Sequence, residues 1–212
     1  LETVPLSGVV KLDPIEVRKR WQANRDQYPG EFDQERGAVE RDLRTEQVEI
    51  LKREADQIIQ SAALNDAKQF KERGRWLVMP EDWSSKVKRL EVISVQVGEA
   101  IQKRTGTLLP PPVLNRTRWM DVADLSAAPG IGRSQVAIGA RLTPFPLIIQ
   151  ETREVAGEDA RGPQVGVLSR RPATDQLGNM YYYRITAARP EGPPESLDAV
   201  REDVVRNVKR LH

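Results

Sequence analysis

The side chains most often used for acid–base, nucleophilic and metal chemistry are nearly absent from this chain of 212 residues. There is no cysteine, and the only histidine is His212, the last residue. Terminal residues of most domains are poorly ordered, so we expect no catalytic role for this histidine. The composition therefore argues against Ser-His-Asp triads, thiol nucleophiles, zinc ribbons and iron–sulfur clusters, and we predict no metal site and no cofactor.

Carboxylates are abundant, with 31 Asp and Glu against 33 Lys and Arg. A pair of carboxylates could hydrolyse a glycosidic bond, but the acidic residues lie on predicted solvent-facing sides of helices and no pair stands out. The formal net charge of +2 is too small to indicate a nucleic-acid or membrane partner by itself. No stretch approaches about 18 consecutive apolar residues, so we predict no membrane span in this chain.

One glycine-rich turn has the form of a phosphate-binding motif. Pro129-Gly130-Ile131-Gly132 resembles the turn of helix-hairpin-helix DNA-binding modules, in which backbone N–H groups hold a phosphate. The positions that would pack the second helix are Val136 and Gly139, and no broad basic surface surrounds the turn. A plain turn explains the motif equally well, so DNA binding remains a minor alternative.

Aromatic side chains supply the remaining candidates for a binding site. The tryptophans are either core anchors, which is the better default, or part of an apolar groove for peptides. Tyrosines at 181–183 alternate between the two faces of a predicted strand, so at least one ring should face outward. The candidate peptide-binding residues are Trp76, Trp83, Trp119, Tyr181 and Tyr183.

The first half of the chain should be mainly helical. Ser7-Gly8 indicates a turn before a β-type run from Val9 to Leu12. Asp13-Pro14 then has the form of an N-cap followed by proline, which predicts a helix to about Asp26. From Phe32 to about Arg73 there is no proline, and apolar residues recur every three or four positions, which predicts one amphipathic helix. A helix that long must pack on a partner or project as an arm.

The middle of the chain predicts one more helix and then a boundary. A helix capped by Ser84 or Ser85 should run to Arg104 and stop at Gly106, although 90–97 also alternates like a strand. Leu109 and the three prolines that follow form a stiff extended connector, the best candidate for a domain boundary.

The remainder changes from helical to β-type patterning. Short apolar runs predict strands at 147–150, 164–168 and 180–186, and the last two should form a hairpin around Leu177-Gly178-Asn179. After a Pro/Gly linker at 189–195, Ser196 should cap a final helix.

The start of the long helix is echoed in the final helix. The pattern Phe32-Asp33-x-x-Arg36-x-x-Val39-x-Arg41-x-Leu43 matches residues 197–208 without a gap. Two capped amphipathic helices could converge on this pattern, because helix starts favour Asp and core faces favour Leu or Val.

Two groups of short motifs follow one another along the chain. The first is a helix, a Tyr28-Pro29 turn and the helix start Phe32-Asp33-x-x-Arg36. The second, near the C-terminus, is Gly166-x-x-Ser169, Thr174, Gly178, the run 181–186, Arg189-Pro190 and 197–201. In this order the motifs resemble those of SurA-type chaperones and parvulin-type prolyl isomerases of bacterial envelopes. The resemblance covers about two-thirds of the chain and leaves 75–125 unexplained.

The resemblance implies a chaperone without isomerase chemistry. Parvulin-type domains carry two histidines, one near the start of the first strand and one just after the glycine of the last. Here the second position falls at Met180 or Tyr181, and no internal histidine exists for the first. No catalytic residue can be transferred, so a degenerate domain is the better expectation. An active isomerase remains the alternative, because isomerisation needs only a shaped pocket to lower a barrier of about 20 kcal/mol.

We therefore expect an α+β protein with a chaperone-like function. Residues 1–108 should be mainly helical, 113–188 a small parvulin-like domain, and 196–212 a helix that packs back on the N-terminal helices. The expected function is binding of non-native or extended polypeptides in the periplasm or cell envelope, with no catalysis. A divergent prolyl isomerase, a helix-hairpin-helix DNA-binding module and a structural interaction protein are the alternatives. No signal peptide lies within these residues, so the compartment follows from the resemblance alone.

Overall fold

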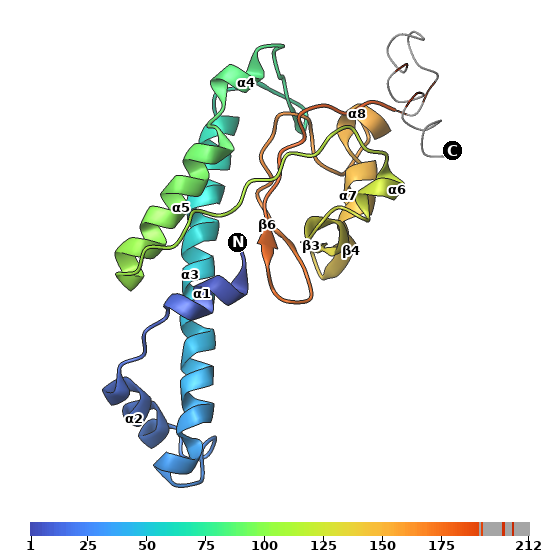
Figure 1. The fold of residues 1–212 in the computed structure, drawn as a ribbon. Coiled ribbons are helices and arrows are strands. Elements are labelled where there is room, and N and C mark those ends of the chain that lie inside the picture. The colour runs from blue at the N-terminus through green and yellow to red at the C-terminus, as the bar shows by residue number, and fades with distance from the viewer. Residues whose placement is uncertain (191, 193–200, 202–204, 206–212) are drawn as a thin grey trace.

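A single long helix, α3 (Phe32–Ala67), organises the molecule, as Figure 1 shows. The computed structural model describes residues 1–190, 192, 201 and 205. Helix α3 has 36 residues and is therefore about 54 Å long. The predicted long helix is confirmed, but it ends before Arg73. The chain then turns through a small hairpin of β1 (Glu72–Arg73) and β2 (Trp76–Leu77), with Gly74 at φ +64° between them.

The N-terminal half of α3 is covered by α2 (Pro14–Ala23). The Asp13 side chain accepts a hydrogen bond from the Ile15 N–H at 2.8 Å, which confirms the predicted N-cap. Val17 of α2 is buried with three residues from the turn and α3. These are Tyr28, Val39 and Leu43. The separate cluster explains why the two helices stay together at this end of the molecule, away from the main core.

The first residues form a helix, α1 (Thr3–Val9). The prediction of a β-type run at Val9–Leu12 is therefore wrong. Leu6 and Val9 lie one helical turn apart, and both are buried against α3 beside Val48 and Leu51. Helical spacing buries both side chains on the same partner, which an extended strand of alternating faces would not do.

The C-terminal half of α3 packs against α5 (Leu90–Thr105). Ile93, Val97 and Ile101 of α5 are buried at helical spacing, so 90–97 is helix and not strand. Gly106 adopts φ +67° and donates its N–H to the Gln102 carbonyl at 2.8 Å, which confirms the predicted stop.

The helix expected from Ser84 or Ser85 to Arg104 is interrupted. A short helix, α4 (Trp83–Lys86), stops before Val87, whose backbone is extended, and α5 begins at Leu90. The Lys88 N–H donates to the Asp66 carboxylate at 2.9 Å. This bond to α3 takes the donor that a continuous helix would have used internally, so a tertiary contact accounts for the break.

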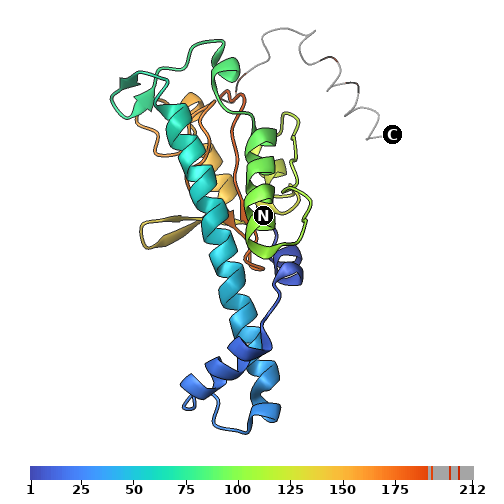
Figure 2. The same ribbon diagram turned by 90° about the vertical axis from the view of Figure 1, so that its left-hand side faces the viewer.

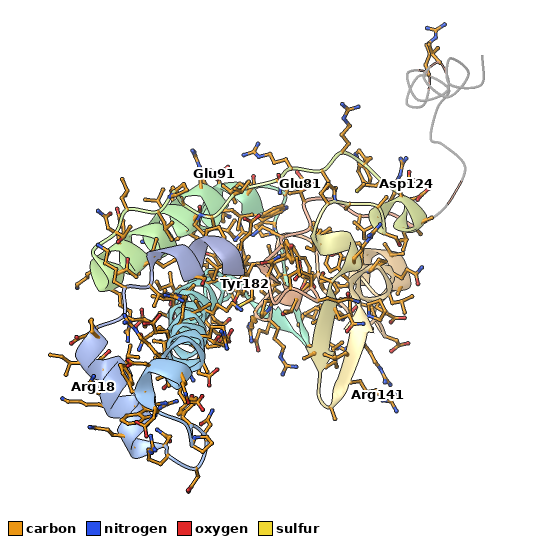
Figure 3. The ribbon with its side chains drawn as sticks, turned by 60° about the horizontal axis from the view of Figure 1, so that its bottom comes forward. Arg18, Glu81, Glu91, Asp124, Arg141 and Tyr182 are labelled. Atoms are coloured by element: carbon orange, nitrogen blue, oxygen red, sulfur yellow. The ribbon has the colours of Figure 1, made fainter. Side chains whose placement is uncertain are left out.

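The rest of the described chain is a small domain built on a four-stranded antiparallel sheet in the order β4-β3-β5-β6. The strands are β3 (Gln135–Ile138), β4 (Arg141–Pro144), β5 (Ala173–Thr174) and β6 (Met180–Tyr181). The remaining elements are α6 (Val122–Leu125), η1 (Ile131–Arg133), α7 (Phe145–Gln150) and α8 (Arg153–Ala156). The β3–β4 hairpin projects to one side of the molecule (Figure 2), and Arg141 lies near its tip (Figure 3). The α+β class is thus confirmed.

Two of the expected strands differ from the structure. Residues 147–150 belong to α7, because Phe145 and Ile148 at helical spacing are both buried in the small core beside Val136. Residues 164–168 form no regular strand. The predicted hairpin pairing is nevertheless present, since the Gly166 N–H donates to the Ile185 carbonyl at 2.8 Å and Leu168 bridges Arg184.

The loop of this hairpin is organised by the carboxylate of Asp175. One oxygen accepts the backbone N–H groups of Leu177 and Asn179, and the other accepts the Tyr181 hydroxyl at 2.8 Å. Burial alone would raise the pKa of Asp175, but hydrogen bonds from Asn179, Tyr181 and the backbone outweigh it and lower the pKa below 3.8.

We expect this loop to weaken in acid. The pKa of the Asp175 carboxyl group is lower in the folded protein than in the unfolded chain. Such a group stabilises the fold at pH values above its unfolded pKa. This stabilisation is lost as the pH falls through the folded pKa. Asp175→Asn should therefore be less stable than wild type at neutral pH, and the difference should shrink below about pH 4. Urea unfolding at several pH values measures it, and a difference that is constant with pH would contradict the assignment.

The predicted C-terminal helix (196–212) and the echo at residues 197–208 lie outside the described residues, apart from Arg201 and Val205. The predicted packing of that helix on the N-terminal helices is therefore a prediction still. In the described part of the chain, every helix is too short or too polar to cross a bilayer.

Candidate functional site

The five aromatic residues proposed for peptide binding mostly make internal contacts. Trp76 is 7% exposed, and its indole N–H donates to the Glu158 carbonyl at 3.0 Å. Trp83 is half-buried and lies against Gly166, where a Cβ would come within 2.9 Å of its ring. Both rings hold the segment 75–85 against the loop after α8.

The tyrosines belong to the small core, and only Trp119 is exposed. Tyr183 packs edge-on against Phe145 with ring centroids 4.8 Å apart, and burial raises its pKa to about 12. Tyr181 lies against Gly130 and donates its hydroxyl to Asp175. Trp119 is 66% exposed, with the Arg189 guanidinium 5.2 Å from its ring centroid. Four of the five rings therefore pack within the fold, which fits the core interpretation better than an apolar peptide groove.

The glycine-rich turn at 129–132 is used for packing. The N–H groups of Ile131, Gly132 and Arg133 donate to the carbonyls of Pro129, Ala128 and Gly130. Those amides are not free to hold a phosphate. Strand β3 follows the turn where a helix-hairpin-helix module would place its second helix. The geometry thus gives the DNA-binding alternative no support.

The small domain is fastened to α3 by two buried polar contacts. Arg184 and Asp66 form an ion pair at 2.7 Å, with side chains only 6% and 9% exposed. The Tyr182 hydroxyl donates to Asp56 at 2.6 Å, and Figure 3 shows Tyr182 between the long helix and the small domain. Burial is the main cause that raises the pKa of Tyr182 and lowers that of Arg184. These contacts are structural, because the Tyr182 hydroxyl, both carboxylates and the two terminal nitrogens of Arg184 are engaged within the protein.

On another side of α3, this helix and α5 form a shallow open groove of about 560 Å³. Its apolar floor is formed by Ile58, Ala62 and Ala100. Its polar lining comes from Glu54, Gln57, Ser61, Asn65, Lys88 and Gln96. The groove combines a narrow apolar strip with carboxamide and hydroxyl groups and with the charged side chains of Glu54 and Lys88.

The α3 rim of the groove has a regular spacing. Gln57, Ser61 and Asn65 are exposed and follow one another at four-residue steps, which places them about 6 Å apart along the helix axis. Alternate residues of an extended chain are about 6.6 Å apart. The hydrogen bonds among the described residues include none from these three side chains. The rim can therefore offer donors and acceptors to successive peptide groups of an extended segment.

The flank of α5 away from this groove already holds an extended segment of the chain itself. Residues between Gly106 and Asp121 have no regular secondary structure. Ser94 donates its hydroxyl to the Pro112 carbonyl at 2.7 Å, and the Pro111 Cα would lie 3.4 Å from a Cβ at Gly98. The predicted proline-rich connector has no regular secondary structure and is docked on α5 rather than free.

Sequence reasoning missed the groove, although part of its signal was visible. Uncharged polar residues recur at 57, 61 and 65 in a helix whose other exposed positions are mostly charged. The opposite wall comes from α5, about 35 residues later along the chain, and no local pattern indicates which faces of the two helices meet. Among the described residues no cluster of three or more His, Asp or Glu side chains could hold a metal ion.

Comparison of the chain with protein-family models, with curated proteins and with solved structures finds no match. Functional inference therefore depends on the geometry above and on the sequence resemblance.

Proposed function

We propose that this protein binds extended, non-native polypeptide segments without catalysis, in the groove between α3 and α5. The observation that carries the proposal is the rim of carboxamide and hydroxyl groups beside an apolar floor. Amides pair with the peptide backbone, which every sequence shares, and the apolar floor favours small or aliphatic side chains. Such a site would recognise unfolded chain in general rather than one sequence.

The dimensions of the groove support a short segment as the occupant. Glu54 and Asn65 mark its two ends on α3, and eleven residue steps of helix span about 16 Å. An extended chain of about five residues has that length. The Ser94–Pro112 contact supports the same proposal, because it shows α5 holding an extended segment through a side-chain bond to a carbonyl.

The resemblance to SurA-type chaperones led to the same function and adds a location, the bacterial cell envelope. We also propose that residues 113–188 are a parvulin-like domain without isomerase activity. At the positions where the family has its second histidine, Met180 exchanges backbone hydrogen bonds with Leu1 and the Tyr181 hydroxyl is bound to Asp175. Both positions are engaged in structural contacts, which supports the non-catalytic proposal.

The proposal predicts that the protein slows aggregation of an unfolded client and binds a labelled, permanently unfolded polypeptide. Gln57→Ala combined with Asn65→Ala should weaken that binding about 10- to 30-fold, because each lost hydrogen-bonding site contributes about 1 kcal/mol. Fluorescence anisotropy measures the affinity. The matched control is Gln102→Ala, an exposed glutamine of α5 outside the groove, which should bind like wild type.

Two results would contradict the proposal. If the purified protein neither binds the polypeptide nor slows aggregation, the function is wrong. If binding is unchanged in the double variant, the groove is not the site. Acceleration of a proline-peptide isomerisation assay above background would instead favour the isomerase alternative.

A further inference from the structure

The groove carries a single uncompensated charge, the ammonium group of Lys88. Glu54, the only acidic residue of the lining, is paired with Arg104 at the opposite end. The ion pairs among the described residues do not include Lys88. Its ammonium group donates only one long hydrogen bond, to the Gln96 carboxamide at 3.3 Å. An ammonium group has three donors, so Lys88 can accept a further partner without losing an existing one.

The neighbouring acidic groups are already committed. Asp66, whose carboxylate receives the Lys88 backbone N–H, is buried and paired with Arg184. Glu91, in the first turn of α5, is paired with Arg116 at 2.8 Å. Helix α3 ends and α5 begins at this end of the groove, so their terminal dipoles have opposite signs and largely offset each other. Lys88 is therefore the free charge of the groove lining at this end.

We infer that the groove selects polypeptide segments that present a carboxylate at its Lys88 end. This inference rests on the proposed function and names the class of segment that the same site prefers. The carboxylate is either the C-terminus of a chain or an acidic side chain, since both offer the same two oxygens to an ammonium group. The charge at one end also gives the bound segment a direction, because at the other end Glu54 is paired with Arg104 and offers no free charge.

A set of short fluorescent peptides of alternating valine and serine tests the inference. One has a free C-terminal carboxylate, one has a C-terminal amide, and one is amidated with glutamate as its last residue. The free carboxylate should bind wild type about fivefold tighter than the amide, which is the scale of a partly exposed ion pair. The glutamate peptide reports whether a side-chain carboxylate is accepted as well.

Lys88→Met keeps the aliphatic stem and the backbone bonds to Asp66 and Arg184, so it isolates the charge. It should abolish the fivefold preference, so that the carboxylate and amide peptides bind the variant equally well. The matched control, Lys103→Met, changes an exposed lysine of α5 outside the groove and should keep the preference.

The failures of the two proposals are distinguishable. Equal binding of carboxylate and amide peptides to wild type, or a preference that survives Lys88→Met, overturns the carboxylate inference and leaves the groove intact. Loss of binding of the amide peptide in the Gln57/Asn65 double variant confirms the groove independently of charge. If no peptide binds wild type, the proposed function fails, and the carboxylate inference fails with it.

Discussion

Asp66→Ala should lower the free energy of unfolding by about 3–5 kcal/mol, the largest effect that we expect from a single substitution. The substitution would leave the Arg184 guanidinium buried without its carboxylate partner, and one nitrogen of that guanidinium, Nε, already lacks a hydrogen-bond partner. It would also remove the acceptor of the Lys88 N–H, which positions the start of α5. Urea unfolding followed by circular dichroism measures the loss.

Two further variants test whether the loss of stability comes from leaving a buried charge unpaired or simply from removing a charged side chain. Asp82→Ala removes an exposed ion pair with Lys86 and should cost less than about 1 kcal/mol. Asp66→Leu combined with Arg184→Met removes both buried charges and should cost less than Asp66→Ala alone. An Asp66→Ala protein as stable as the Asp82→Ala protein would show that the pair does not fasten the small domain to α3.

Gly132→Ala should destabilise the small domain by about 3 kcal/mol through overpacking. A Cβ at this position would collide with the Leu125 carbonyl oxygen and lie 2.8 Å from the Ser126 carbonyl oxygen. Both atoms belong to the backbone at the end of α6, so the strain cannot be relieved by rotating a side chain. Thermal and urea unfolding measure the change.

Gly37→Ala is the matched control for this substitution. Gly37 lies inside α3, and a Cβ there would have no contact closer than 3.8 Å, to the Arg41 side chain. Alanine is favoured over glycine in a helix interior by about 1 kcal/mol, so this variant should be as stable as wild type or more so. If the Gly132→Ala protein is as stable as the Gly37→Ala protein, the turn does not pack closely on α6.

The Gly132 substitution also bears on how the turn at 129–132 was interpreted. A glycine-rich turn suggests exposed amides for an anion, because glycine lets a ligand approach the backbone closely. Here the close approach is made by the chain itself, by Tyr181 over Gly130 and by the end of α6 over Gly132. The motif alone does not distinguish a ligand from another part of the fold.

The features that could be predicted from the sequence depend on contacts between near neighbours. The Asp13 cap, the stop at Gly106 and the uninterrupted course of α3 from Phe32 follow from side-chain capping, a left-handed glycine and the absence of proline, although α3 ends at Ala67 rather than near Arg73. The hairpin around Leu177-Gly178-Asn179 belongs to the same class. Its loop is closed by hydrogen bonds to Asp175 from residues two and four positions later in the chain.

The features that were mispredicted depend on partners far along the chain. Residues 147–150 are short and apolar, and such a run becomes helix or strand according to what it is buried against. The break at Val87 is set by Asp66, 22 residues before Lys88. The aromatic residues show the same dependence, since their number and type are visible in the sequence but the burial that makes Trp76 a core anchor is not.

The amino-acid sequence was sufficient to establish the α+β class, the long helix and the absence of cysteine and internal histidine, because these follow from composition and short-range hydrogen bonds. The tertiary structure was needed to place α5 beside α3, to pair Arg184 with Asp66 across 118 residues and so to leave the groove with Lys88 as its free charge. Those arrangements come from the packing of two amphipathic faces and the desolvation of paired charges. Both contributions to the free energy arise only from tertiary contacts in the folded chain, so no local sequence pattern predicts them.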